Sequence, residues 1–124
     1  MEKKVLIIED EADIRDAMAE AVEEAGMIVH TAPDGETGLQ KALVEKPDLI
    51  LLDIKMPLMD GHQVLEQLRA HPEGKDLKVI MLTSMDDVKN ITEAHTGSIT
   101  DYIIKAHSSL EDIVSKIKLE IYSD

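Results

Sequence analysis

Five short apolar runs alternate with amphipathic stretches along the chain, and this alternation is the feature that most constrains its fold. The runs are apolar throughout, which is typical of parallel strands covered on both faces. They comprise residues 3–8, 27–31, 49–52, 78–82 and 102–104. Right-handed crossovers place helices on both faces of a parallel sheet only if the chain reverses its direction across the sheet once. The sequence therefore predicts a doubly wound α/β domain, a parallel sheet between two layers of helices.

An amphipathic stretch with apolar residues at helical spacing follows each run. The clearest apolar stripe lies near the C-terminus and begins after Ser109, whereas the weakest lies at residues 88–94. Asp60 is placed to cap the start of one helix, and Gly26 stands where another should end. Because there is no linker, repeat or low-complexity tract, we expect one domain over residues 1–124.

The charge balance excludes some classes of partner. Thirteen basic and 26 acidic residues give a net charge of −13, which repels nucleic acid and anionic membranes. The N-terminal apolar run is too short for a signal peptide, and no apolar stretch is long enough for a membrane span. With no cysteine in the chain, disulfides and thiolate metal sites are excluded. We expect a cytoplasmic protein that contacts neither nucleic acid nor membrane.

Polar residues directly follow four of the apolar runs. Glu9 and Asp10 follow the first run, Asp53 the third, Thr83 the fourth and Lys105 the fifth. Because the carboxyl ends of parallel strands meet at one edge of the sheet, these groups should lie together. Three carboxylates at such an edge repel one another, and a hard divalent cation such as Mg²⁺ relieves that repulsion. The acidic loop after the first run would repel the phosphate of a nucleotide or flavin.

A metal beside a carboxylate, a hydroxyl and an ammonium indicates phosphoryl chemistry. Asp53 could attack phosphorus and form an acyl phosphate, since carboxylates serve as nucleophiles of this kind. Mg²⁺, Thr83 and Lys105 would then share the oxygens of the transferred group. The strand would act as a rigid mount for Asp53.

Four segments carry a resemblance to a known family. They are VLIIEDE at residues 5–11, DIKMPLMDG at 53–61, VIMLTS at 79–84 and DYIIK at 101–105. In this order and at these intervals, the chain resembles the receiver domain of two-component response regulators over nearly its whole length. The resemblance implies a flavodoxin-like (βα)5 three-layer sandwich with strand order 2-1-3-4-5.

The resemblance also implies roles for the residues of the metal and phosphorylation site. Asp53 corresponds to the phosphoacceptor, which receives its phosphoryl group from a histidine kinase or a histidine phosphotransfer protein. Asp10 corresponds to the acid that binds Mg²⁺ directly, and Glu9 to the neighbouring acid that acts largely through metal-bound water. The main-chain carbonyl of Lys55 would be a further ligand, and Lys105 matches the lysine of the family's site.

A signalling switch is implied as well. Thr83 corresponds to the switch hydroxyl and Tyr102 to the aromatic switch residue. In the family, phosphorylation draws the hydroxyl inward, the ring follows, and the surface of the fourth helix, fifth strand and fifth helix changes. We expect that surface to contact a downstream target protein, with the chain a monomer or a phosphorylation-dependent dimer.

One position departs from the family. Most members have a proline after the lysine, joined by a cis bond, and here that residue is Ala106. Because a cis bond before a residue other than proline costs about 3–4 kcal/mol, it either persists under strain or becomes trans. We predict that Lys105 still reaches the site, through a more mobile loop.

Two other classes of function compete with a phosphorylated regulator. A magnesium-dependent phosphatase of the haloacid dehalogenase type also uses an aspartate at a strand end, but it needs a second acid two residues later, where this chain has Lys55. It also needs a lid, for which 124 residues leave no room. A receiver-like module that is no longer phosphorylated is favoured only by Ala106. We expect no ordinary enzyme and no output domain after the last helix, with a stand-alone receiver and a piece of a longer protein both open.

Overall fold

The strands form one parallel sheet of the expected order. The computed structural model describes residues 2–94 and 98–123. The first and last residues of the domain expected over residues 1–124 lie outside the described part. Its sheet has the order β2-β1-β3-β4-β5, as predicted. The strands are β1 (Lys4–Ile8), β2 (Ile28–Ala32), β3 (Leu49–Asp53), β4 (Val79–Thr83) and β5 (Asp101–Ile104). Both β3 and β4 end one residue later than the apolar runs, so Asp53 and Thr83 belong to the strands themselves.

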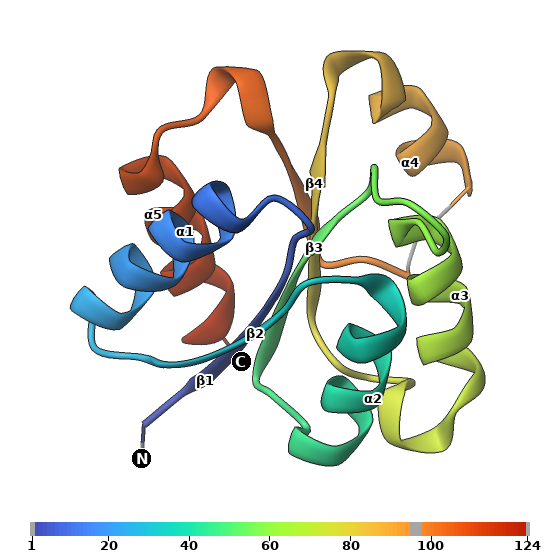
Figure 1. Cartoon of the computed structure of the whole chain (residues 1–124), viewed down its shortest axis with the longest axis horizontal. Helices are drawn as coiled ribbons and strands as arrows, with labels where there is room; N and C mark the ends of the chain where they lie inside the picture. Colours follow the sequence, from blue (N-terminus) through green and yellow to red (C-terminus); the bar gives the residue numbers. More distant parts are fainter. Residues whose placement is uncertain (1, 95–97, 124) are drawn as a thin grey trace.

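Five helices cover the two faces of this sheet. They are α1 (Ala12–Glu24), α2 (Gly35–Glu45), α3 (Gly61–Ala70), α4 (Val88–Ala94) and α5 (Leu110–Ile121). Helices α1 and α5 lie on one face, and α2, α3 and α4 lie on the other (Figure 1). The doubly wound architecture is therefore confirmed. In the described part of the chain, no helix is long and apolar enough to span a bilayer.

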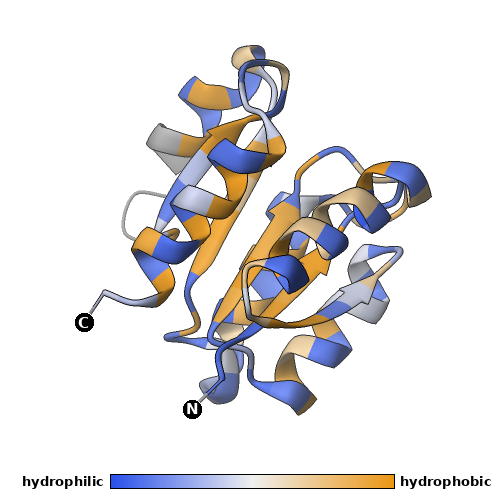
Figure 2. Cartoon of the chain, turned by 90° about the vertical axis from the view of Figure 1, so that its left-hand side faces the viewer, coloured by the Kyte–Doolittle hydropathy of each residue, from blue (hydrophilic) through white to orange (hydrophobic). Residues whose placement is uncertain are grey.

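Each face of the sheet has its own hydrophobic core. Leu6 and Ile8 of β1 pack under α2 and α3, whereas Val5 and Ile7 pack under α1 and α5. Successive side chains of a strand point to opposite faces, so a strand in the middle of the sandwich has to be apolar at every position. This explains the uninterrupted apolar runs, which appear as the central hydrophobic layer in Figure 2. All five residues of β3 are buried, Asp53 included.

Capping residues fix where the helices begin. Asp60 accepts a hydrogen bond from the backbone N–H of Gln63, and the Gln63 side chain accepts one from the backbone of Asp60. Such a reciprocal pair satisfies backbone donors that the first turn leaves free. Ser109 and Asp112 form the same arrangement at the start of α5. Gly26, after α1, has a φ of +96°, which a glycine adopts without strain. The predicted cap and helix end are both confirmed.

Candidate functional site

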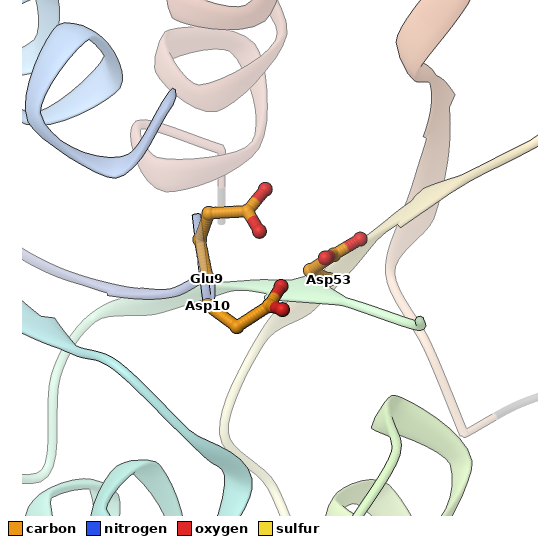
Figure 3. A group of neighbouring side chains, drawn as sticks. All are labelled: Glu9, Asp10 and Asp53. Atoms are coloured by element: carbon orange, nitrogen blue, oxygen red, sulfur yellow. The ribbon is translucent and has the colours of Figure 1, made fainter. Parts of the chain in front are cut away.

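Three carboxylates converge at the carboxyl ends of β1 and β3. Glu9 and Asp10 follow β1 directly, Asp53 is the last residue of β3, and the two strands are hydrogen-bonded neighbours. One oxygen of each carboxylate lies within 4.8 Å of the others, and Figure 3 shows the three groups gathered at this edge. Glu9 is fully buried, and Asp53 is only 3% exposed. The carboxylates that the sequence predicted to lie together do so.

Lys105 reaches both buried carboxylates from β5, two strands away from β3. Its Nζ lies 2.9 Å from Oε1 of Glu9 and 3.3 Å from Oδ1 of Asp53. It is the first residue of a short 3-10 turn, Lys105–His107, that follows β5. Among the described residues no peptide bond is cis, so the Lys105–Ala106 bond is trans. The predicted reach of Lys105 is present, whereas the predicted mobility of its loop remains a prediction.

Burial and mutual repulsion shift the protonation of these groups. Burial first, and then the neighbouring Glu9, raises the pKa of Asp53 to about 7, although Lys105 acts in the opposite direction. Burial also acts to raise the pKa of Glu9, but hydrogen bonds with Asp53 and Lys105 outweigh it and the pKa is lowered. The two carboxyl groups therefore titrate as a pair that shares a proton. Burial opposes the charge of Lys105, yet both carboxylates hold its pKa above the usual value.

Asp10 provides the observation that fits a cation. Its Oδ1 is buried without a hydrogen-bond partner, and burial followed by the neighbouring Glu9 raises its pKa. A buried carboxylate oxygen normally has a partner, so an unpartnered one beside two other acids fits a cation-binding site. With carboxylate oxygens as the donors, the set suits Mg²⁺ better than a soft metal. Lys55 is exposed in the loop after β3, and the role of its main-chain carbonyl remains a prediction.

The two expected switch residues lie outside this cluster. Thr83 is the buried last residue of β4, and its hydroxyl donates to the carbonyl of Ser84 at 2.9 Å. Tyr102 lies in β5 opposite Met81. Its half-buried ring packs against the core beneath α2, α3 and α4. Their switch roles therefore remain predictions.

Gly61 allows the backbone to close tightly behind Asp53. Its N–H donates to the carbonyl of Ile54 at 2.8 Å. A Cβ at this position would lie 2.6 Å from the carbonyl oxygen of Asp53, closer than side chains are found. Only glycine lets α3 begin directly against the end of β3, which gives Asp53 a firm support.

Sequence reasoning missed one residue that contacts the site. Arg15 lies in α1, and its Nη1 donates to the main-chain carbonyl of Glu9 at 2.9 Å. In the sequence it is one more charged residue in a helix with many, so the pattern gave no signal. Only the folded β1–α1 turn brings its guanidinium to that carbonyl.

Comparisons with known proteins agree with the fold and the acidic site. The model of a family described as the response regulator receiver domain matches residues 5–118. A protein of Guillardia theta named "Probable transcriptional regulator ycf27" is 40% identical over 110 residues, which are 88% of this chain and 42% of that protein. The alkaline phosphatase synthesis transcriptional regulatory protein PhoP of Bacillus subtilis is 38% identical over 90% of this chain and 45% of its own length. The chain thus spans less than half the length of these two relatives.

A solved structure shares the fold over its full extent. The chemotaxis protein CheY4 of Vibrio cholerae superposes with a TM-score of 0.84 at 28% identity, covering 97% of this chain and 99% of the other. The strand order and the family match point to one classification. The chain belongs to the response regulator receiver domain family of two-component systems.

Proposed function

We propose that this receiver domain accepts a phosphoryl group on Asp53 from a histidine kinase or a histidine phosphotransfer protein, with Mg²⁺ bound at the acidic edge. The observation that carries the proposal is the position of the Asp53 carboxylate. It is buried at a strand end, within 4.8 Å of two further acids and 3.3 Å from the Lys105 ammonium. A structural aspartate would not need that convergence of opposite charges around it.

The proposed reaction uses groups of this chain at every step. An Asp53 carboxylate oxygen attacks phosphorus and the P–O bond of an acyl phosphate forms. The P–N bond of the donor phosphohistidine breaks, and because its other ring nitrogen already carries a proton, the histidine leaves as neutral imidazole. Lys105 shifts from carboxylate to phosphoryl oxygens, where its charge stabilises the transferring group. Mg²⁺, held by Glu9, Asp10, Asp53 and the Lys55 carbonyl, would offset the negative charge that collects there.

We propose that phosphorylation changes the conformation of side chains on β4 and β5. The Thr83 hydroxyl would exchange its bond to the Ser84 carbonyl for one to a phosphoryl oxygen, and Tyr102 would then repack toward the vacated space. A groove of about 520 Å³ runs beside β5 and α5, lined in part by Tyr102, Lys116 and Leu119. We propose that a downstream protein binds the surface of α4, β5 and α5, with activation leaving a monomer or producing a dimer.

The same proposal defines what the domain does not do. The phosphoryl group would be accepted by Asp53 and later removed from Asp53 by hydrolysis. The domain would therefore act as a regulator and not as an enzyme with a separate substrate. The two relatives are named as transcriptional regulators, but the net charge of −13 argues against nucleic-acid binding by this domain. A reducing cytoplasm is supported by the absence of cysteine.

Intact-mass measurement after incubation with acetyl phosphate and Mg²⁺ tests the proposal. We expect one phosphoryl adduct on the wild type, none on Asp53→Asn, and none on the wild type when EDTA replaces Mg²⁺. The asparagine keeps the shape of the side chain but removes the nucleophilic oxygen anion. An adduct of equal yield on Asp53→Asn would assign the chemistry to another residue and contradict the proposal.

A further inference from the structure

Arg15 holds the backbone of the turn that presents Glu9 and Asp10. Its side chain is half-buried, and Nη1 donates to the main-chain carbonyl of Glu9 at 2.9 Å. That carbonyl belongs to the peptide group joining Glu9 to Asp10. A change of ψ at Glu9 or of φ at Asp10 would reorient the two carboxylates relative to each other, because these two angles flank this peptide group.

Other hydrogen bonds restrain the same turn at different atoms. The N–H of Glu9 donates to the carbonyl of Ala32 at 3.1 Å, which ties the turn to β2 on the other side of Glu9. The N–H of Glu11 donates to the carboxylate of Glu9 at 3.2 Å. Glu11 occupies the N-cap position of α1 but makes no side-chain capping bond. The Arg15 bond thus fastens the start of α1 to the end of β1 where a capping bond is missing.

We propose that Arg15 is a positioning residue for the magnesium site. It acts through the Glu9 carbonyl by fixing the Glu9–Asp10 peptide, so that the orphaned Oδ1 of Asp10 and the Glu9 carboxylate face Asp53 before the cation binds. This inference rests on the proposed function, since it assigns Arg15 to the site that binds Mg²⁺ there. Partners that orient metal ligands in this way reduce the reorganisation that binding requires.

Arg69 offers a matched arginine elsewhere in the fold. Its guanidinium also donates to main-chain carbonyls, those of Ser98 and Gly74. It lies in the last turn of α3, whereas the first turn of α3 lies against Asp53. Loss of Arg69 therefore removes the same kind of anchor without touching the turn that carries the acids.

The test compares the metal-free fold with Mg²⁺ affinity in three variants. Arg15→Met keeps the aliphatic stem and removes the donors, Arg15→Lys restores one donor, and Arg69→Met is the control. Thermal unfolding in EDTA reports the anchor's structural role, and isothermal titration calorimetry with MgCl₂ reports the Kd. We expect Arg15→Met to weaken Mg²⁺ binding about tenfold, the scale found for partners that orient metal ligands. Arg15→Lys should recover most of that loss, and Arg69→Met should lower the Tm without changing the Kd.

The outcomes separate the inference from the proposed function. A wild-type Kd in Arg15→Met, with a lowered Tm like that of Arg69→Met, would make Arg15 a purely structural anchor and overturn the inference alone. A wild-type protein that does not bind Mg²⁺ would contradict the proposed metal site, whatever the variants do. If Arg15→Met does not fold, Arg15→Gln serves the same comparison.

Discussion

Helices α3 and α4 lie on the same face of the sheet and follow neighbouring strands, yet they are built very differently. Helix α3 has ten residues, a reciprocal cap at Asp60 and three buried side chains larger than glycine, those of Val64, Leu65 and Leu68. Helix α4 has seven residues and follows a 3-10 turn, and among its residues 88–91 only Ile91 is buried. A helical segment with few buried side chains, such as residues 88–91, opens or shifts at lower cost than one with many.

The two helices also contact different parts of the site: α3 lies against the phosphoacceptor, and α4 follows the residues proposed to respond to phosphorylation. The start of α3 lies against the carbonyl of Asp53, so the phosphoacceptor rests on the well-packed helix. Helix α4 follows Thr83 and Ser84, the residues proposed to respond. We therefore expect the α3 side to hold its geometry and the α4 and β5 side to change.

Removal of Lys105 should have the largest effect, because it removes the ammonium that contacts the phosphoacceptor itself. Lys105→Ala removes the ammonium that contacts the buried carboxylates of Glu9 and Asp53. It also removes a positive charge that would stabilise the transition state. We expect phosphorylation from acetyl phosphate to slow about 100-fold, the scale of losing one such electrostatic contact.

Lys78→Ala provides the matched control for Lys105→Ala. The Nζ of Lys78 donates to the carbonyls of Glu120 and Ser123 at the C-terminal end of α5, away from the acids. This variant should be less stable but phosphorylated at the wild-type rate. Equal rates in both lysine variants, measured by intact mass over time, would remove Lys105 from the mechanism.

Truncation of one core residue in each helix tests the difference in packing. Leu68 and Ile91 are both fully buried. Leu68→Ala should cost about 3 kcal/mol of unfolding free energy, because its surroundings cannot collapse around the cavity. Ile91→Ala should cost about 1 kcal/mol, because α4 can yield locally. Urea unfolding measures both values, and similar costs would show that α4 is anchored as firmly as α3.

The pH dependence of the unfolding free energy tests the raised pKa of Asp53. The pKa of Asp53 is raised from 3.8 to about 7 in the folded state, so the folded chain holds the proton longer than the unfolded chain. Stability from this group is therefore present at low pH and lost as pH rises toward 7. The pKa of Glu9 is lowered from its ordinary value of 4.5, so its contribution changes only at more acidic pH.

Between about pH 5 and pH 8, in EDTA, we expect the wild type to lose about 2 kcal/mol more stability than Asp53→Asn. The variant has no ionisable group at this position, so it removes the titration that Asp53 shares with Glu9. Urea unfolding across this pH range is the measurement. Parallel pH profiles for the two proteins would contradict a buried Asp53 with a raised pKa.

The smallest effect on chemistry should come from Thr83. Thr83→Ala removes a hydroxyl that now bonds to Ser84, and phosphorylation should slow by no more than about fivefold, the worth of one neutral hydrogen bond of about 1 kcal/mol. The response at Tyr102, followed by its amide resonance, should be lost. A Tyr102 response that survives in Thr83→Ala would break the proposed path from the site to β5.

The sequence predicted the elements of this fold well because each strand is buried on both faces. Such burial leaves an unbroken apolar run that pattern reasoning detects. The apolar runs stop one residue before the ends of β3 and β4, at Asp53 and Thr83, because a polar side chain at a sheet edge still takes part in the backbone ladder. A hydropathy pattern depends only on the side chains, so it does not detect the backbone hydrogen bonds of that ladder.

The predicted acids and Lys105 were brought together because strand order alone determines where strand ends meet. Contacts through the main chain were not predictable in the same way. Arg15 binds a carbonyl, and every residue has one, so no residue pattern marks its partner. The geometry of Lys105–Ala106 also depends on local backbone conformation, here a trans bond within a 3-10 turn.

The most direct test follows backbone amide resonances of the ¹⁵N-labelled protein before and after phosphorylation with acetyl phosphate and Mg²⁺. Apart from the loops that touch Asp53, we expect the largest shifts in residues 84–91 and at Tyr102. We expect small shifts in Val64–Leu68 of α3 and no phosphorylation-dependent shifts in Asp53→Asn. Shifts of equal size in α3 and α4, or shifts that persist in Asp53→Asn, would contradict a switch supported by one helix and expressed through the other.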